Sequence, residues 1–133
     1  MGQLKAGTGR TDITPNLGCH LVGYFEDRVA DGIHDPLYVK ALALQSGDCT
    51  LGLVTCDLID IPVEVVEAAK RMIQDRTGVA PECILISCTH THTAPSAVGA
   101  LGTPQETAYS RSLVPRIADA FVLAYASLVP AEV

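Results

Sequence analysis

Two apolar segments separated by a short polar turn constrain the fold of this chain more than any other feature. Residues 38–45 alternate between apolar and polar side chains, and a second apolar run covers residues 51–56. The residues between them include Ser46, Gly47 and Asp48, which favour tight turns. Alternation with a period of two is typical of a half-buried strand, so the sequence predicts a β-hairpin over this region.

A helix is predicted directly after the hairpin. Apolar residues recur there at every third or fourth position, as Val65, Val66, Ala69, Met72 and Ile73. This spacing places them on one face of a helix. Pro62 suits the first turn of such a helix, where a missing N–H costs nothing, and Gly78 suits the position just past its end.

The C-terminal half repeats the combination of strand and helix. Residues 83–88 are apolar and predict a strand, and their low polarity predicts a central place in the sheet. Residues 103–106 form a capping-box sequence with proline at the first helical position, which predicts the start of a second helix. Pro115 is expected to kink this helix or divide it in two. The helix is expected to bury Leu113, Val114, Ile117, Phe121, Tyr125 and Leu128.

The N-terminal region predicts a strand followed by a long loop. The strand covers residues 4–14 and ends at Pro15, and residues 16–35 are rich in glycine, aspartate and proline. A loop of that length in a compact domain is usually functional or disordered. The complete order βββαβα predicts an α/β fold, in which helices pack on a mixed β-sheet. A chain of 133 residues fits one domain, so we expect residues 1–133 to form a single domain.

The charge pattern argues against several classes of partner. A formal charge of −6 without a basic patch is unsuited to nucleic acid. No stretch is long and apolar enough to form a transmembrane segment, and the first residues lack a secretory signal, so a cytoplasmic location is expected. Only 18% of the residues are charged, against about 25% in ordinary domains. We therefore expect part of the surface to be buried in a homo-oligomer or by a further C-terminal domain.

The cysteines predict free thiols. Their number is odd, no CxxC pair occurs, and most lie in apolar runs: Cys19, Cys49, Cys56, Cys83 and Cys88. Small buried thiols in a reducing compartment explain this pattern better than a set of disulfides does.

His90 and His92 are the first candidates for chemistry. They follow the predicted strand at 83–88, in the sequence Thr-His-Thr-His-Thr. If the strand continues through them, both side chains point to the same face, with Cα atoms about 6.6 Å apart. Two imidazoles at that spacing can bind one zinc ion at about 2.1 Å each. Two loop histidines without a role are the alternative, because an HxH pair alone is a weak signal.

His34 is a third candidate, in a loop between Gly32 and Pro36. Asp35 or Asp57 could accept a hydrogen bond from an imidazole and orient it, although for Asp57 a cap or turn role after its strand is favoured over this one. His20 is assigned no role. The sequence contains no GxSxG nucleophile motif and no catalytic-cysteine signature.

Four segments resemble, in the same order, motifs of the neutral and alkaline ceramidase family. Residues 6–15 are similar to its aGxxRxDITP opening, and residues 32–38 to its GIHDPLY segment. Residues 53–58 are similar to its LVSxDL strand, and residues 89–95 to its THTHSGP box, with Thr93-Ala94 in place of Ser-Gly. The chain thus resembles the N-terminal part of a ceramidase-like hydrolase domain.

This resemblance implies the fold of a zinc-dependent amide hydrolase. His34 and His92 map to zinc ligands of the family, and His90 would lie beside the metal and assist substrate or transition-state binding. The zinc would polarise the substrate carbonyl or lower the pKa of a bound water. The family's other ligands, a glutamate and a tyrosine, lie downstream of the matched segments. The resemblance therefore implies that this chain alone leaves zinc half-coordinated.

Two functions compete at this point. The first is a zinc-dependent hydrolase-family domain, incomplete as a single chain, that acts on an amide or related bond of a small-molecule or lipid-like substrate. The alternative is a non-catalytic oligomeric binding or structural module that retains the fold. The three histidines favour the hydrolase, whereas the low charge fraction and the missing ligands favour the module. No lipid-binding feature is evident in the sequence, so ceramide itself is not the expected substrate.

Overall fold

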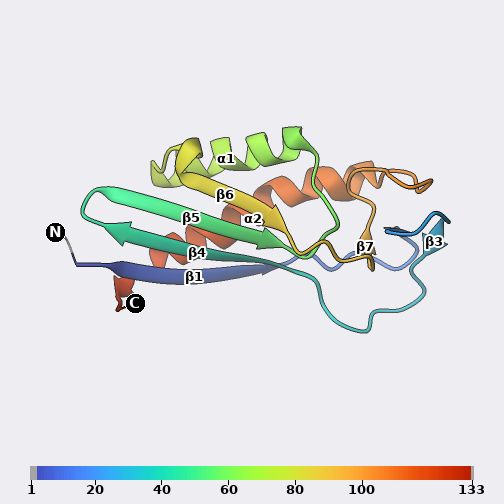
Figure 1. Ribbon diagram of the computed structural model, residues 1–133, viewed down its shortest axis with the longest axis horizontal. Helices are drawn as coiled ribbons and strands as arrows, with labels where there is room; N and C mark the ends of the chain where they lie inside the picture. Colours follow the sequence, from blue (N-terminus) through green and yellow to red (C-terminus); the bar gives the residue numbers. More distant parts are fainter. Residues whose placement is uncertain (1–2, 133) are drawn as a thin grey trace.

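A mixed β-sheet forms one layer of the molecule and two helices form the other (Figure 1). The computed structural model describes residues 3–132. Within them the main sheet has five strands in the order β6-β5-β4-β1-β8. Its strands are β1 (Lys5–Asp12), β4 (Tyr38–Ser46), β5 (Cys49–Cys56), β6 (Ile84–Cys88) and β8 (Val129–Pro130). The pair β5–β6 is parallel and the other pairs are antiparallel, so the predicted α/β fold with a mixed sheet is confirmed.

The predicted hairpin is the centre of this sheet. Strands β4 and β5 pair antiparallel from Val39 opposite Cys56 to Ser46 opposite Cys49. Gly47 has a φ of 58°, a left-handed conformation that glycine adopts without steric cost, and it turns the chain between the strands. The second strand begins two residues earlier than the apolar run indicated, because the turn is short.

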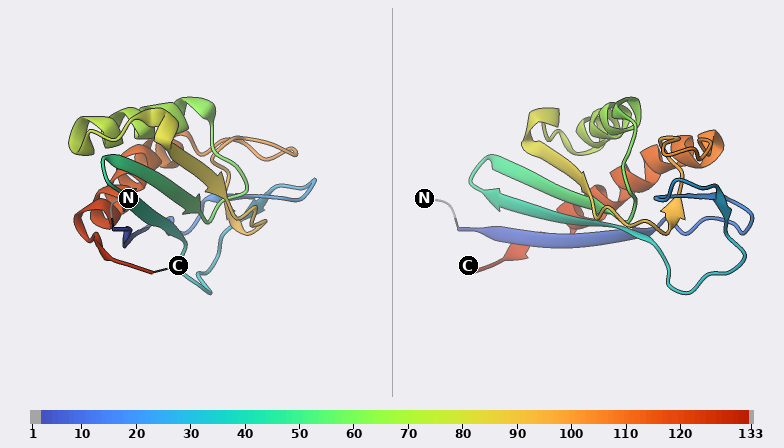
Figure 2. Two further views of the ribbon diagram at one scale, coloured as in Figure 1. Left: turned by 60° about the vertical axis from the view of Figure 1, so that its left-hand side comes forward. Right: turned by 45° about the vertical axis from the view of Figure 1, so that its right-hand side comes forward.

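Both helices lie on the same side of the main sheet (Figure 2). Helix α1 (Val63–Thr77) packs against α2 (Thr107–Ala126), and α2 packs on β1 and β4. The helix-facing residues of β4 are buried, namely Val39, Ala41 and Ala43. Leucines on the opposite face are exposed, including Leu51, Leu53 and Leu85, so among the described residues nothing covers that face.

The ends of α1 follow the sequence signals closely. Pro62 lies at the N-cap, one position before the predicted first turn. Gly78 ends the helix in the left-handed region, with a φ of 76°, and its N–H donates to the Gln74 carbonyl at 2.8 Å. Glycine commonly ends helices in this way because a Cβ atom is disfavoured in that conformation.

Helix α2 begins differently from the prediction. Its first residue is Thr107, with Glu106 at the N-cap, and the expected capping box does not form. The Glu106 carboxylate instead accepts a hydrogen bond from the His20 N–H at 2.7 Å. Pro115 lies inside one continuous helix and does not divide it. Leu113, Ile117 and Phe121 are fully buried, as the helical spacing predicted.

Within residues 3–132, strand β6 lies at the edge of the sheet, so the prediction of a central strand was wrong. A 3₁₀ turn, η1 (Pro81–Cys83), precedes it and delays its start by one residue. Ile84 faces the helices and is buried, whereas Leu85 faces the uncovered side and is 61% exposed. The apolar composition of this strand reflects an apolar uncovered face rather than burial on both sides.

A second, smaller sheet replaces part of the predicted loop at residues 16–35. Among the described residues it has three strands in the order β3-β2-β7, with β2 (His20–Val22), β3 (Arg28–Val29) and β7 (Ala94–Pro95). It lies beyond the carboxyl ends of β5 and β6 (Figure 1). Each strand is two or three residues long, too short to leave a periodic pattern in the sequence.

The cysteines are all free in the described chain, as predicted, but they are not all buried. Cys56 is buried and Cys49 is exposed. Burial raises the pKa of the Cys56 thiol to about 12 and that of the Cys88 thiol to about 11, so both are neutral at physiological pH. Among residues 3–132, no helix has the length and apolarity to cross a membrane.

Candidate functional site

The two histidines of the Thr-His-Thr-His-Thr segment lie together where β6 leaves the sheet. Strand β6 ends at Cys88, and the N–H of Thr89 still donates to the Cys56 carbonyl at 3.0 Å. His90 then adopts a φ of 61°, in the left-handed region, so the strand does not continue as predicted. The turn nevertheless brings the rings of His90 and His92 together, with centroids 5.1 Å apart in an edge-to-face arrangement.

The His90 ring is oriented by a backbone carbonyl. Its Nδ1 atom lies 2.9 Å from the carbonyl oxygen of Ile59, in the segment that follows β5. A carbonyl can only accept, so in the neutral ring this contact places the proton on Nδ1 and leaves Nε2 as the acceptor. This is the arrangement that commonly prepares a histidine to bind a metal or accept a proton. His90 is an exposed residue.

His92 is held by the segment that joins β2 and β3. The Arg28 guanidinium donates to the His92 carbonyl at 2.6 Å, and the Tyr24 ring lies edge-on to the His92 ring, with centroids 6.0 Å apart. Gly23 packs directly on His92: a Cβ atom at this position would lie 2.6 Å from the His92 Cβ. The small sheet thus supports the histidine box, and the strand β7 that follows it pairs with β2.

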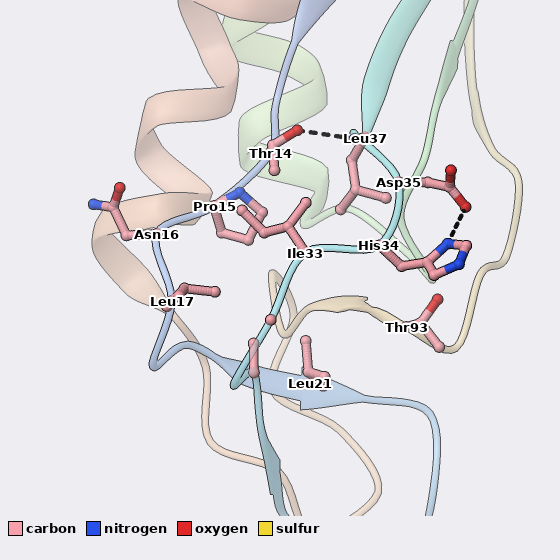
Figure 3. A pocket seen from close by; sticks show the side chains of 12 residues that line it. Thr14, Pro15, Asn16, Leu17, Leu21, Ile33, His34, Asp35, Leu37 and Thr93 are labelled. Atoms are coloured by element: carbon pink, nitrogen blue, oxygen red, sulfur yellow. Dashed lines mark hydrogen bonds and ion pairs between the residues drawn. The ribbon is translucent and has the colours of Figure 1, made fainter.

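His34 lies in the segment between β3 and β4, apart from the His90–His92 pair. Its Nδ1 lies 2.8 Å from a carboxylate oxygen of Asp35, and its side chain is 97% exposed. Together with Thr93, it lines a cavity of about 390 Å³ (Figure 3). The other walls of this cavity are mainly apolar, and include Pro15, Leu17, Leu21, Ile33 and Leu37. His34 and the end of the histidine box therefore face a common space, through Thr93.

The described residues do not complete a metal site. Between residues 3 and 132, no three or more His, Cys, Asp or Glu side chains lie close enough together to hold a metal ion. The structure brings His90 and His92 together and leaves His34 paired with Asp35. Zinc in proteins takes four donors, so further donors would have to come from outside the described residues or from water.

The two candidate orienting carboxylates behave differently. Asp35 does hydrogen-bond a histidine, as predicted. Asp57 instead accepts from the Tyr38 N–H at 3.0 Å and lies 3.8 Å from the Lys40 ammonium, so it joins β4 to the end of β5. The alternative of a turn residue is therefore the correct one for Asp57.

Three groups of this site escaped the sequence analysis: the Ile59 carbonyl, Tyr24 and Arg28. A backbone carbonyl leaves no mark on the sequence. Tyr24 and Arg28 lie in the segment that was predicted to be a loop. The sequence signal available there was an aromatic residue directly after Gly23 and a cation a few positions further on. Gly23 has a φ of 134° in the structure. Glycine at such a φ marks a close backbone approach, here to His92.

Replacing Asp35 with asparagine is expected to lower the pKa of His34. The hydrogen bond to the Asp35 carboxylate, and then its charge, raise the His34 pKa above its ordinary value, because both favour the imidazolium. Removing that charge should return the midpoint toward about 6.5. NMR titration of the His34 ring protons measures this, with Asp31→Asn as a control that removes a nearby charge. An unchanged His34 midpoint in Asp35→Asn would show that the pair does not form in solution.

Comparison with solved structures identifies the fold. Over 98% of this chain, the crystal structure of neutral ceramidase from Pseudomonas aeruginosa superposes with a TM-score of 0.85 at 22% identity. The fold is that of the neutral ceramidases. A second ceramidase structure, complexed with C2, gives a TM-score of 0.80, also at 22% identity over 98% of the chain. The resemblance inferred from the four sequence motifs is thereby confirmed at the level of the fold.

The ceramidase-like fold of this chain is one part of those larger proteins. It spans 22% of the length of each of the two ceramidase chains. No protein-family model matches the sequence, and no curated protein matches it closely enough to count as a relative. The comparison therefore identifies the fold alone.

Proposed function

We propose that this chain is part of a ceramidase-like, zinc-dependent hydrolase and supplies the histidines of the metal site, which a single chain leaves incomplete. The observation that carries the proposal is the His90–His92 pair, in which a carbonyl fixes the proton of His90 on Nδ1. The pair follows β6, at the carboxyl ends of two parallel strands, where binding sites of α/β sheets gather.

Each histidine has a role in this proposal. His92 and His34 are metal ligands, and His90 assists substrate or transition-state binding, with Nε2 as the acceptor of a hydrogen bond or proton. When bound, zinc would supply polarisation of the scissile carbonyl or activation of a water. A further domain or a second copy of the chain would supply the missing donors and cover the exposed leucines of the sheet. The bond hydrolysed is an amide or a related one.

The cavity beside His34 bears on the substrate. Its walls are mainly apolar, with His34 and Thr93 among the polar groups that line it. Such a shape suits the apolar part of a small-molecule or lipid-like amide and orients its polar end toward the histidines. A cytoplasmic location is part of the proposal, because the five described cysteines are free thiols, as expected in a reducing compartment.

The second candidate function is a non-catalytic binding or structural module with the same fold. It is favoured by the absence, within residues 3–132, of a cluster of three metal-binding side chains. Metal binding separates the two functions. The module needs no zinc, whereas the hydrolase domain needs its histidines for zinc.

Replacing both His34 and His92 with alanine is expected to abolish zinc binding. After dialysis of tag-free protein against zinc, the metal per chain is measured by mass spectrometry and the fold by circular dichroism. The matched control is His20→Ala, because His20 pairs with Asp27 at 2.8 Å and has no proposed role. Equal zinc in the double variant and the wild type would contradict the proposal.

Zinc should also leave the wild-type chain below about pH 6, since a histidine must be neutral to bind it.

A further inference from the structure

Arg28 makes a single, specific hydrogen bond to the backbone of the histidine box. Its Nη2 atom donates to the carbonyl oxygen of His92 at 2.6 Å, although the two residues are 64 positions apart in the sequence. A hydrogen bond from a charged donor is shorter and stronger than one between neutral groups. This bond therefore fixes the peptide of His92 relative to strand β3.

The guanidinium itself is held in place by an aromatic ring. Its carbon lies 4.1 Å from the centroid of the Tyr24 ring, within the range of a favourable cation–π contact. The Nε atom of Arg28 is buried and has no hydrogen-bond partner among the described residues. Burial of an unpaired donor costs free energy, so the position of Arg28 is set by its contacts with His92 and Tyr24 and not by full hydrogen bonding of its own side chain.

The same segment also contacts the His92 side chain. The Tyr24 ring meets the His92 ring edge-on, and the Gly23 backbone, between β2 and β3, lies directly against the His92 Cβ. His92 is therefore held through its carbonyl by Arg28 and through its ring by Tyr24. The His90 ring in turn lies against the His92 ring.

We propose that Arg28, stacked on Tyr24, is a positioning residue that sets the His92 peptide and thereby holds the His90 and His92 rings in contact. The inference rests on the proposed function only for the use that is made of His92. The contact between the rings is a property of the metal-free chain, so it can be tested whether or not zinc binds.

The test is the nuclear Overhauser effect between the His90 and His92 ring protons in metal-free protein. Arg28→Met keeps most of the alkyl stem but removes the donor, and it should abolish this effect. Arg28→Lys keeps a cation that can reach the same carbonyl, and it should retain the effect at reduced intensity. Tyr24→Leu removes the ring beneath the guanidinium and should weaken the effect. Tyr24 is half-exposed, so this variant provides the test if Arg28→Met does not fold.

Arg76→Met is the matched control. Arg76 forms an ion pair with Asp119 that joins α1 to α2. Removing it perturbs the packing of the helices and no group that contacts the histidines. The control should lower the melting temperature and leave the ring contact intact. A full-strength effect in a folded Arg28→Met or in Tyr24→Leu overturns the proposal. If Arg28→Met loses the ring contact and the wild-type chain binds no zinc, the positioning role is supported and only the proposed function is contradicted.

Discussion

Replacing Gly9 with alanine is expected to be among the most destabilising single substitutions in this protein. A Cβ atom at Gly9 would lie 2.2 Å from the Ala120 carbonyl oxygen and 2.7 Å from the Ala124 backbone nitrogen. Both atoms belong to the backbone of α2, which cannot rotate away as a side chain can. The whole helix would have to move off β1, which we expect to cost about 3 kcal/mol or more. For a small domain stable by about 5–15 kcal/mol, that is a large part of the total.

Urea denaturation measures this loss directly. Gly32→Ala is the matched control, because a Cβ at Gly32 would meet nothing within 4 Å. It should change the free energy of unfolding by less than about 0.5 kcal/mol. A Gly9→Ala protein with the denaturation midpoint of the wild type would mean that α2 does not approach β1 as closely as described.

The second large effect is expected at Phe121, the largest fully buried side chain of the described residues. Its ring fills the space that Gly52 leaves open on β5, and it stacks near Tyr125, with centroids 6.4 Å apart. Phe121→Ala would leave a cavity between α2 and the sheet, because the glycine below it has no side chain to fill the space. We expect a loss of about 3–5 kcal/mol in the free energy of unfolding.

Leu123→Ala provides the control for Phe121→Ala in the same helix. Leu123 is 51% exposed, so truncation removes few core contacts. Its effect should stay within about 1 kcal/mol in the same urea experiment. Similar losses for the two variants would show that the core does not lie where α2 meets β5.

The elements that could be predicted are those whose own residues decide their structure. The hairpin at 38–56 and helix α1 each show the period of their type over many residues. Strand β2 pairs with β7, more than 70 positions away in the sequence, and neither strand is long enough to show a period. The capping box failed because Glu106 makes a hydrogen bond to His20, a partner that no local pattern reveals.

The candidate site divides in the same way. The proximity of His90 and His92 was predicted, but a left-handed turn at His90 produces it rather than an extended strand. The joining of His34 to that pair stays a prediction, because it depends on loops that meet only through tertiary structure. Arg28 could not be found from the sequence, since its partner is a backbone carbonyl 64 residues away.

The central claim is that the histidine box and His34 form the part of a zinc site that this chain supplies. The most direct test is to titrate zinc into the tag-free wild-type chain while the histidine ring signals are followed by NMR. We expect the His34 and His92 signals to shift together and saturate near one zinc per chain, while the His20 signals stay in place. Zinc at millimolar concentration that leaves the His34 and His92 signals unmoved would contradict it.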